Sequence, residues 1–419
     1  MRRTDLRSTA AEWSGRDQES DIRMTAVAPA HTVHGLEQDA FADALALIAD
    51  RAAEHDRAGA FPFAAFEALR AIGAPALVVP VEYGGLGAGL AEAVEVIERV
   101  GAADPSVGLI LQWNYTNHLS LLRDDSPWPA ELKERVLRSA ATDGALINGL
   151  AVERELGSLS RGGIPATTAT RLSSGEWRID GEKAYATGIS GLSWFTVTTS
   201  TAEPNPRVAT FLLDRTATDW HVEPTWNHLG LRASDTQSVV FDGTVVADAR
   251  LVDLRDPNDG TTKIRRAGRQ ALPLLLAANY NGVAIAARDW LVRYLHTRVP
   301  TALGDSLATV PRFHDRVGEI EAWIQTSRAL VCQGVASLAD DEHSRLPALA
   351  KHVATATAIR VTESALDLTG NPGLDRRHPL ERHHRDAMVG RIHFPQSDFV
   401  LADLGRAALA AGRAKEEQP

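Results

Sequence analysis

The residues best suited to chemistry lie near the end of the chain, between His378 and Gln396. Four histidines fall in this segment, and His393 is the strongest candidate because an imidazole titrates near neutrality and can donate a hydrogen bond to a ligand. His383 and His384 precede Arg385, and we expect them on a solvated helix face or paired with acids. Because no histidine pair shows the HExxH or tight Cys/His spacing of zinc sites, we predict no metal.

Hydrophobic periodicity divides the chain into three ordered parts after a polar N-terminal segment. The pattern is helical from about Val33 to Asp143, alternates with a period of two from Leu146 to Asp253, and becomes helical again from Thr262. The order helical, β, helical predicts a mainly α protein with a central β-domain. We predict the boundaries as follows: 1–34 a disordered tail, 35–145 an N-terminal helical domain, 146–253 a middle β-domain, and 254–419 a C-terminal helical bundle.

Local patterns refine these elements. Trp177–Gly188 is predicted to form strand, tight turn and strand, with Asp180-Gly181 as the turn. Further strands are predicted at Ser193–Ser200, Arg207–Leu213, His221–Pro224 and Ser238–Val246. Long helices are predicted at Ala271–Arg298, Val310–Leu338 and Leu346–Thr369, followed by two shorter ones, which suggests an antiparallel bundle.

Composition excludes several classes of function. The formal charge of −10 gives no reason to expect a nucleic-acid partner, and no apolar run approaches the roughly 20 residues of a membrane span. A single cysteine, Cys332, excludes an internal disulfide and fits a reducing cytoplasm. Since Cys332 lies in an apolar helical run, we expect it to be an inert core thiol.

Several motifs together resemble the acyl-CoA dehydrogenase superfamily. Leu368-Thr369-Gly370-Asn371-Pro372-Gly373 and the segment Pro379–Asp386 resemble its Gly-rich turn and Pro-x-Glu-[Arg/Lys]-x-x-Arg-Asp helix. Val78–Gly87 and Trp226–Asp235 match its Pro-x-x-Tyr-Gly-Gly-x-Gly and Gly-x-Arg-[Ala/Gly]-[Ser/Thr] elements. The resemblance implies a helical N-terminal domain, a middle β-barrel or sandwich and a C-terminal four-helix bundle. It also implies a flavin cofactor, either FMN or FAD.

The resemblance assigns flavin-binding roles to particular residues. Thr187 would contact the ring and Tyr185 would form its wall, although a β-strand threonine satisfied by its neighbours is the alternative. Arg298, in Tyr294-Leu295-His296-Thr297-Arg298, would reach the flavin phosphate of a neighbouring subunit, although a helix C-terminus also attracts cations by itself. The remaining flavin contacts implied are Gly188, Ser234, Asn371 and Gly373.

The base that dehydrogenases use is missing from both of its usual positions. That carboxylate lies nine residues after the arginine corresponding to Arg385, where this chain has Phe394, and relatives that carry it on the first bundle helix would place it near Leu272. The loop Val152–Ser160 matches the family pattern only in part, which puts acyl-CoA binding in doubt. A dehydrogenase of this sequence would need a relocated base, for which Glu153 and Glu155 are candidates.

The terminal segment is more similar to that of two-component flavin monooxygenases of the same fold. This resemblance implies reduced flavin from a separate reductase, a C4a-hydroperoxide, and oxygenation of a small molecule. His393, Asn148 and Thr187 would hold the oxygen adduct, and the substrate pocket would be lined by Trp113, Tyr115, Asn117, His118 and Phe394. For His118, a buried core histidine is the alternative.

Three functional hypotheses follow. The leading one is a cytoplasmic flavin monooxygenase, the second is a dehydrogenase with a relocated base, and the third is a catalytically silent flavin- or CoA-binding subunit. The bundle helices are apolar on more than one face, so we expect a homodimer or homotetramer.

Overall fold

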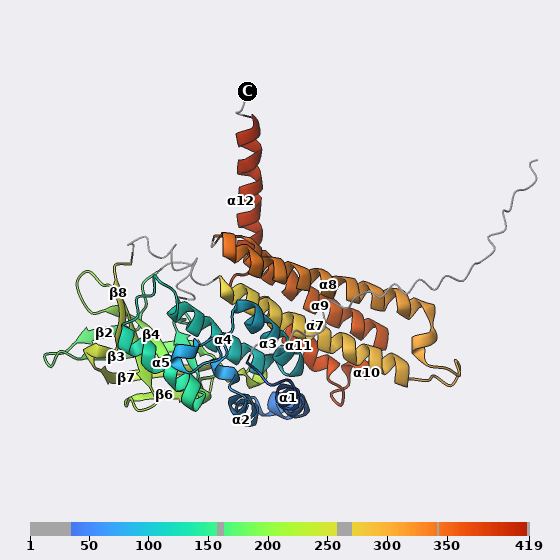
Figure 1. The fold of residues 1–419 in the computed structure, drawn as a ribbon, viewed down its shortest axis with the longest axis horizontal. Helices are drawn as coiled ribbons and strands as arrows, with labels where there is room; N and C mark the ends of the chain where they lie inside the picture. The colour runs from blue at the N-terminus through green and yellow to red at the C-terminus, as the bar shows by residue number, and fades with distance from the viewer. Residues whose placement is uncertain (1–34, 157–162, 258–269, 342, 417–419) are drawn as a thin grey trace, which may run out of the picture. The chain divides into compact units, whose positions relative to one another are not determined.

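The computed structural model describes residues 35–156, 163–257, 270–341 and 343–416 (Figure 1). The predicted tail of residues 1–34 lies outside the described residues. Helices precede and follow a central group of strands, in the order that hydrophobic periodicity predicts. Within the described ranges, no helix has the length and apolarity needed to cross a bilayer.

Five helices lead into the sheet: α1 (Gln38–Ala58), α2 (Phe63–Ala71), α3 (Leu90–Ala103), α4 (Pro105–Leu121) and α5 (Ala130–Asp143). The Glu37 carboxylate caps α1 by accepting from two backbone amides, and α1 ends at Gly59 in the left-handed region. Most of α4 is buried, so this helix runs through the interior and places side chains on several sides. Short 3₁₀ turns join the helices at η1 (Ala74–Ala76) and η2 (Val81–Tyr83).

The glycine turn after η2 requires its glycines. Gly84 and Gly87 have φ of 88° and 68°, a region that side chains disfavour. At Gly85 an added Cβ would lie 2.1 Å from the carbonyl oxygen of Val79, so the backbone itself fills that space. The Val78–Gly87 element therefore forms a tight turn that leads into α3.

An eight-stranded sheet follows, with strand order β6-β7-β3-β2-β4-β5-β8 and β1 paired to β4. Most neighbours are antiparallel, whereas β4 pairs in parallel with β1 and β2. The strands are β1 (Ile147–Leu150), β2 (Thr168–Arg171), β3 (Trp177–Ala186), β4 (Trp194–Thr201), β5 (Val208–Asp214), β6 (Trp220–Glu223), β7 (Gln237–Val246) and β8 (Leu251–Arg255).

The predicted hairpin at Asp180-Gly181 is wrong. β3 continues through both residues and pairs with β7 along most of its length, with a register shift between Ile179 and Asp180. Gly181 has φ of 135°, and a Cβ there would lie 2.8 Å from the Cα of Thr167. Asp-Gly therefore makes a bulge that lets another segment approach the strand, instead of reversing the chain.

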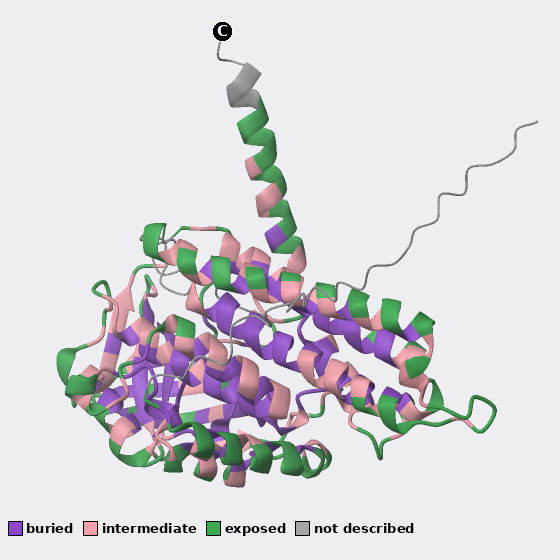
Figure 2. Ribbon diagram, turned by 45° about the vertical axis from the view of Figure 1, so that its right-hand side comes forward, coloured by how far each residue is buried: buried purple, intermediate pink, exposed green. Residues whose placement is uncertain are grey.

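The C-terminal helices are α7 (Ala271–Thr297), α8 (Pro311–Asp340), α9 (Leu346–Thr369), α10 (Asn371–Leu374), α11 (Leu380–Val389) and α12 (Ser397–Glu416). The three long helices match their predicted spans within two residues, and Pro273 lies in the first turn of α7. The purple residues of Figure 2 mark the buried side of these helices, and exposed or partly buried residues follow most of α12.

The prediction that Cys332 is a core thiol is wrong, because its side chain is exposed on α8. Its neighbour Val331 is buried, so the apolar run was correctly placed on a helix but the wrong residue was assigned to the core. His383, which was expected on a solvated helix face or paired with an acid, is instead buried, with 5% of its surface exposed. His384 bonds to the hydroxyl of Thr362 at 3.1 Å.

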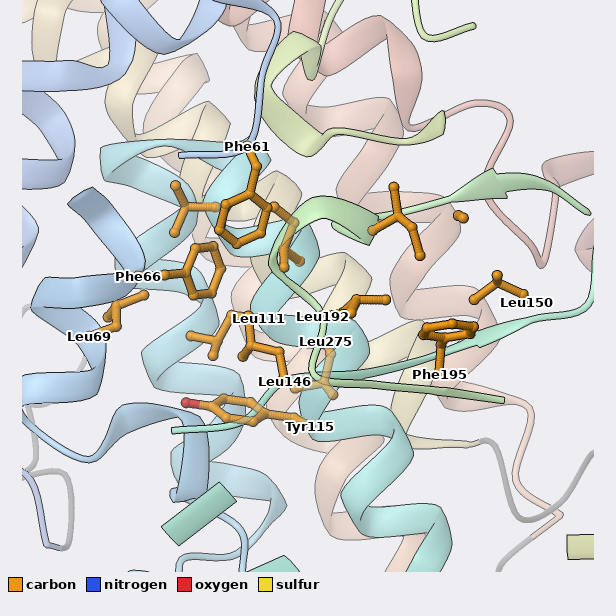
Figure 3. Packing of buried hydrophobic residues seen from close by; sticks show 14 of the residues in the cluster. Phe61, Phe66, Leu69, Leu111, Tyr115, Leu146, Leu150, Leu192, Phe195 and Leu275 are labelled. Atoms are coloured by element: carbon orange, nitrogen blue, oxygen red, sulfur yellow. The ribbon is translucent and has the colours of Figure 1, made fainter. Parts of the chain in front are cut away.

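Contacts far apart in sequence join the three parts. Leu275 and Ala278 of α7 share one core cluster with helices α2–α4 and with strands of the sheet (Figure 3). Arg385 of α11 makes a two-pronged ion pair with Asp56 of α1. These contacts fix α11, and the segment after it, against the other two parts.

Candidate functional site

An amide and three hydroxyls meet where β3 ends. The Asn148 amide donates to the carbonyl of Thr187 at 3.0 Å, and the Thr236 hydroxyl lies 3.1 Å from that of Thr187. Ser234 bonds to Thr236 at 2.8 Å, and all four side chains are buried. The structure therefore brings together Asn148, Thr187 and Ser234, three of the residues expected at the flavin.

Backbone geometry places this group against α4. Gly188 has φ of 76°, and its amide donates to the carbonyls of Ser234 and Asp235. A Cβ on Gly188 would lie 2.9 Å from Cγ2 of Ile110, so only glycine permits this approach of α4. The turn at η5 (Arg232–Ser234) is flanked by left-handed residues Leu231 and Asp235.

Tyr185 lies just before this group and is 46% exposed, although it belongs to β3. Its φ of 59° is costly for a bulky residue, so surrounding contacts must hold it there. The guanidinium of Arg154 is 6.0 Å from the ring centroid, and the ring of His228 meets it edge-on at 6.2 Å. His228 in turn stacks on Trp226 at 3.7 Å.

His228 has a nitrogen that no described residue satisfies. Its Nδ1 is buried without a hydrogen-bond partner, and burial together with the charge of Arg154 lowers its pKa. Buried polar atoms are nearly always paired, so this nitrogen beside an exposed aromatic ring is a candidate contact for a ligand. From the sequence, His228 was noted only as part of the Trp226–Asp235 motif and was not assigned to the site. The aromatic residue Trp226, two positions earlier, was the feature that could have drawn attention to it.

His393 lies on the segment that follows α11. Its Nδ1 is 3.0 Å from the Tyr280 hydroxyl of α7, and no described residue bonds to its Nε2. Burial, reinforced by the positive charge of Lys351, lowers the His393 pKa to about 3. His393 is therefore neutral at physiological pH and can use one nitrogen to accept and the other to donate.

Asp386 is the buried carboxyl on α11. It accepts a hydrogen bond from the Leu231 amide at 2.6 Å, yet burial raises its pKa to about 7. Burial, and after it the charge of Asp386, raises the pKa of Tyr280. Sequence reasoning treated Asp386 only as part of a motif and missed this environment.

No hydrogen bond joins His393 to Asn148 or Thr187 in the part of the chain that the structure describes. The connection is apolar: Leu109, Leu231, Leu272, Leu276 and Tyr280 belong to one buried cluster, and Trp113 packs against it. Trp113 is partly buried and packs against this cluster, to which Tyr280 of the His393–Tyr280 pair belongs. Phe394 is partly buried and contacts the ring of Phe399.

The other α4 residues expected in the pocket have different surroundings. Tyr115 is fully buried, and its hydroxyl donates to the carbonyl of Ala74, so it belongs to the core (Figure 3). Asn117 donates to its own helix at Trp113, and its oxygen lies near Gly149 of β1. His118 is fully buried, neither ring nitrogen has a partner, and burial lowers its pKa to about 3.

Arg298, Asn371 and Gly373 lie away from this group. Arg298 follows the last residue of α7 and is exposed, 18 positions after Tyr280, which is roughly 27 Å along a helix. Asn371 and Gly373 are in α10, directly after α9 ends. Among the described residues, no hydrogen bond, ion pair or ring contact joins Arg298, Asn371 or Gly373 to Thr187, Ser234 or Asn148, so the role expected of Arg298 at a neighbouring subunit's phosphate stays a prediction.

Glu153, a candidate relocated base, is fully engaged elsewhere. Its carboxylate accepts from Lys183 Nζ at 2.5 Å, from the Thr167 hydroxyl and from the amides of Ala166 and Thr167. Lys183 is completely buried, and the network lowers the Glu153 pKa despite its burial. Glu155 is exposed, and the following residues 157–162 of this loop lie outside the described residues.

Comparison with known proteins identifies the family. Models of the acyl-CoA dehydrogenase N-terminal and C-terminal domains match residues 37–142 and 274–397. YdbM of Bacillus subtilis, named as an acyl-CoA dehydrogenase, is 31% identical over 85% of this chain and 92% of its own length. The chain belongs to the acyl-CoA dehydrogenase superfamily. It is therefore a flavin-dependent oxidoreductase, as its motifs predicted.

Two further proteins are similar to this chain. L-Evernosamine nitrososynthase of a Micromonospora strain is 27% identical, over 87% of each chain. The structure of TdsC from Paenibacillus with FMN and indole superposes with a TM-score of 0.79 at 24% identity, covering 89% of this chain and 97% of that one. TdsC shows the shared fold.

The residues on the β-domain fit a flavin. An isoalloxazine needs an apolar or aromatic wall and hydrogen-bond partners at its edge, and its phosphate needs a cation. The exposed Tyr185 ring, the unpaired Nδ1 of His228, the hydroxyl of Thr187 and the guanidinium of Arg154 supply groups of each kind. Within the described residues, no group of three or more His, Cys, Asp or Glu could hold a metal ion.

Proposed function

We propose that this protein is a flavin-dependent monooxygenase that oxygenates a small molecule. The observation that carries the proposal is the chemistry around His393: Phe394 and Leu272 occupy the two usual positions of the dehydrogenase base. Glu153, the buried carboxylate of the altered loop, is bound to Lys183 and Thr167. The site therefore offers the neutral imidazole of His393, beside Phe394, instead of a carboxylate base. A neutral imidazole is better suited to hydrogen bonding with oxygen than to removing an α-proton from a thioester.

The chain's own residues have distinct tasks in this proposal. When bound, the reduced flavin supplies electrons for activating oxygen. Tyr185 forms the wall of its ring, while Thr187, oriented by Thr236, offers a hydroxyl at the ring edge. Asn148 holds the Thr187 carbonyl and so fixes the turn. His393 offers the N–H group of Nε2 as a hydrogen-bond donor. The buried leucines Leu109, Leu231, Leu272 and Leu276, together with Trp113 packed against them, exclude water.

The nitrososynthase relative supports oxygen transfer, because a nitroso group forms when oxygen is added to nitrogen. An amine or another oxidisable heteroatom is accordingly the substrate class we would test first, with aromatic carbon second. The electrons must come from outside the chain, since it contains no nicotinamide-binding motif, and a separate flavin reductase would provide them.

The test is aerobic turnover with FMN or FAD, kept reduced by an added reductase, on a panel of amines, thioethers and indoles in ¹⁸O₂. Incorporation of one ¹⁸O atom per product, lost in H393F and retained in the surface variant H296F, would support the proposal. Flavin oxidation that produces only hydrogen peroxide with every substrate class would count against it.

A dehydrogenase with a relocated base is the second candidate. YdbM favours it, and Asp386 supplies a carboxyl whose pKa of about 7 is suited to proton transfer. Anaerobic mixing of the oxidised flavoprotein with acyl-CoAs decides the matter: bleaching of the flavin that disappears in D386N or E155Q would establish dehydrogenation. Protein that binds neither oxidised nor reduced flavin would instead indicate a silent subunit.

We also propose that the functional unit is a homodimer or homotetramer. Arg298 is exposed at the end of α7, where it could bind a phosphate held mainly by a second subunit. On α12, Leu401 and Leu409 are 53% and 76% exposed. Contiguous exposed apolar surface marks interaction sites, so α12 is the helix we would test first for an interface. The double variant L401E/L409E should shift the mass measured by light scattering to a smaller species, and an unchanged mass would exclude α12 from the interface.

A further inference from the structure

A lysine lies directly beneath the segment that carries His393. Lys351 of α9 is completely buried, and its Nζ donates to the carbonyl of Gly390 at 2.9 Å and to that of His393 at 2.7 Å. Among the described residues, no carboxylate lies within ion-pair distance of it. The other fully buried lysine, Lys183, has Glu153 as its partner. A buried ammonium without a counter-ion is costly, and it is retained where it performs a task.

We propose that Lys351 is a positioning residue of this site: it clamps the segment 390–393, and its charge adds to burial in keeping the His393 ring neutral, with Nε2–H as the donor. This inference rests on the proposed function in one respect only, namely what the Nε2–H group binds. The clamp and the protonation state are properties of the chain itself.

The clamp follows from backbone geometry. Gly390 ends α11, and a Cβ there would lie 2.8 Å from Cγ2 of Thr355 on α9, so α9 and the segment are in direct contact. Two hydrogen bonds from one ammonium, to carbonyls three residues apart, fix both ends of the turn. The His393 ring then has its Nδ1 3.0 Å from the Tyr280 hydroxyl.

The tautomer follows from charge. A protonated ring would place a second positive charge beside Lys351, so the neutral ring is favoured and Nδ1 can accept the Tyr280 proton. The pKa of Tyr280 lies well above 10, which keeps its hydroxyl protonated as a donor. The remaining proton of the imidazole is then on Nε2, for which no described residue is a partner.

The other titratable groups around His393 and Tyr280 do not have the same effect on the His393 ring as Lys351. On α9, His352 bonds to Ser397 at 2.8 Å, and burial, followed by the charge of Lys351, lowers its pKa. On α11, Asp386 is bonded to the Leu231 amide and acts on Tyr280. The charge of Asp386 would favour a protonated His393, so it opposes Lys351 and cannot produce the same outcome.

The first experiment needs no change to the lysine. Protein labelled with ¹⁵N-histidine is titrated between pH 6 and 9, and the His393 ring is assigned by its absence in H393Q. We expect a neutral ring with the proton on Nε2, and an inflection near pH 8 where Lys351, whose pKa burial lowers to about 8, loses its proton. A protonated ring at pH 6, a proton on Nδ1, or no inflection would overturn the proposal.

Two variants separate the clamp from the charge. K351Q keeps donors but no charge, and K351M keeps neither; K133M, on the partly exposed face of α5, is the matched control. With the ¹⁵N titration extended from pH 6 down to pH 3, we expect the His393 pKa to rise in K351Q and K351M but not in K133M, because the charge of Lys351 is one cause of its lowering. Unchanged titration in all three variants would exclude the coupling, whether or not the protein oxygenates any substrate.

Where oxygenation is observed, the activity of the variants adds a second readout. K351Q should retain more product per flavin oxidised than K351M, and its pH profile should follow the new His393 pKa. Equal losses in the two variants with the wild-type pH profile would mean that Lys351 is only structural.

Discussion

The hydroxyl of Tyr280 lies 3.0 Å from Nδ1 of His393 and links the first half of α7 to the segment after α11. The two residues are 113 positions apart, so only the packed bundle brings them together. Tyr280 is fully buried and His393 is partly exposed. The tyrosine is therefore the fixed member of the pair, and the orientation of the histidine depends on it.

Replacing Tyr280 by phenylalanine should uncouple the reaction rather than unfold the protein. The ring still fills its space, so the free energy of unfolding should fall by only about 1 kcal/mol, the value of one hydrogen bond. His393 would lose the partner that orients it, so more hydrogen peroxide and less oxygenated product should form per reduced flavin. Both quantities can be measured in the same assay, with Y294F on the same helix as the control. Unchanged coupling in Y280F would show that the hydrogen bond is not used.

Breaking the Glu153–Lys183 pair should damage stability far more than chemistry. Removing one member of a buried ion pair typically costs about 3–5 kcal/mol because the other charge is left without a partner. We expect such a loss in urea unfolding of E153A or K183M, with partial recovery in the double variant E153Q/K183M. Turnover per folded molecule should stay within a few-fold of wild type in E153Q. A stable E153Q without any activity would revive Glu153 as the base.

The helices and most strands could be predicted from the sequence because local periodicity determines them. The bounds of α9 agree with the prediction at both ends, and β4, β5 and β7 agree within one residue. The prediction of a hairpin at Asp180-Gly181 failed because the same dipeptide occurs both in hairpin turns and in bulges. Which of the two forms here depends on the contact with Thr167, which belongs to another segment. β2 and β8 are short strands that depend on their partners and were missed.

The residues of the candidate site could be predicted only at positions that belong to a family motif. Asn148, Thr187 and Ser234 were found in this way and do meet. Lys351, Tyr280 and His228 were not, because a buried lysine or an unpaired imidazole nitrogen becomes visible only after tertiary packing. Tyr115 shows the opposite error: on a helix buried on nearly all sides, sequence alone does not tell which side faces a ligand and which faces the core.

Buried neutral histidines should make this protein sensitive to acid. Burial lowers the pKa of His118, His383 and His393 to about 3, so each binds a proton more readily in the unfolded chain. Their contribution to stability is present above about pH 6.5 and is lost as pH falls towards 3. Asp386 has the opposite sign, since its raised pKa makes its contribution fall as pH rises from about 4 to 7. Three histidines outweigh one carboxyl, so net stability should decline below about pH 6.

The variant H118L isolates one of these groups. It removes two buried nitrogens that have no partner, so stability at pH 7 should be unchanged or higher. Between pH 6 and 4 the slope of unfolding free energy against pH should fall by about 1.4 kcal/mol per unit, the value of one proton. Urea unfolding at fixed protein concentration over this range measures the slope, with the exposed H296L as control. An unaltered slope would mean that His118 is protonated in the folded protein.

The Asp56–Arg385 pair should hold α11 to α1 and, through α11, fix the segment that carries His393. Both side chains are 16% exposed, and the guanidinium contacts both oxygens of Asp56 as well as Glu381. Bidentate bonds to a carboxylate are among the strong ones, so D56N should lower the free energy of unfolding by about 1.5–3 kcal/mol. R385K should behave similarly, because an ammonium cannot reproduce the planar fork. D50N, an exposed position on α1, is the matched control. Hydrogen exchange should become faster in α11 and the following segment in D56N but not in D50N; equal protection in both would show that α7 and α9 alone hold α11 in place.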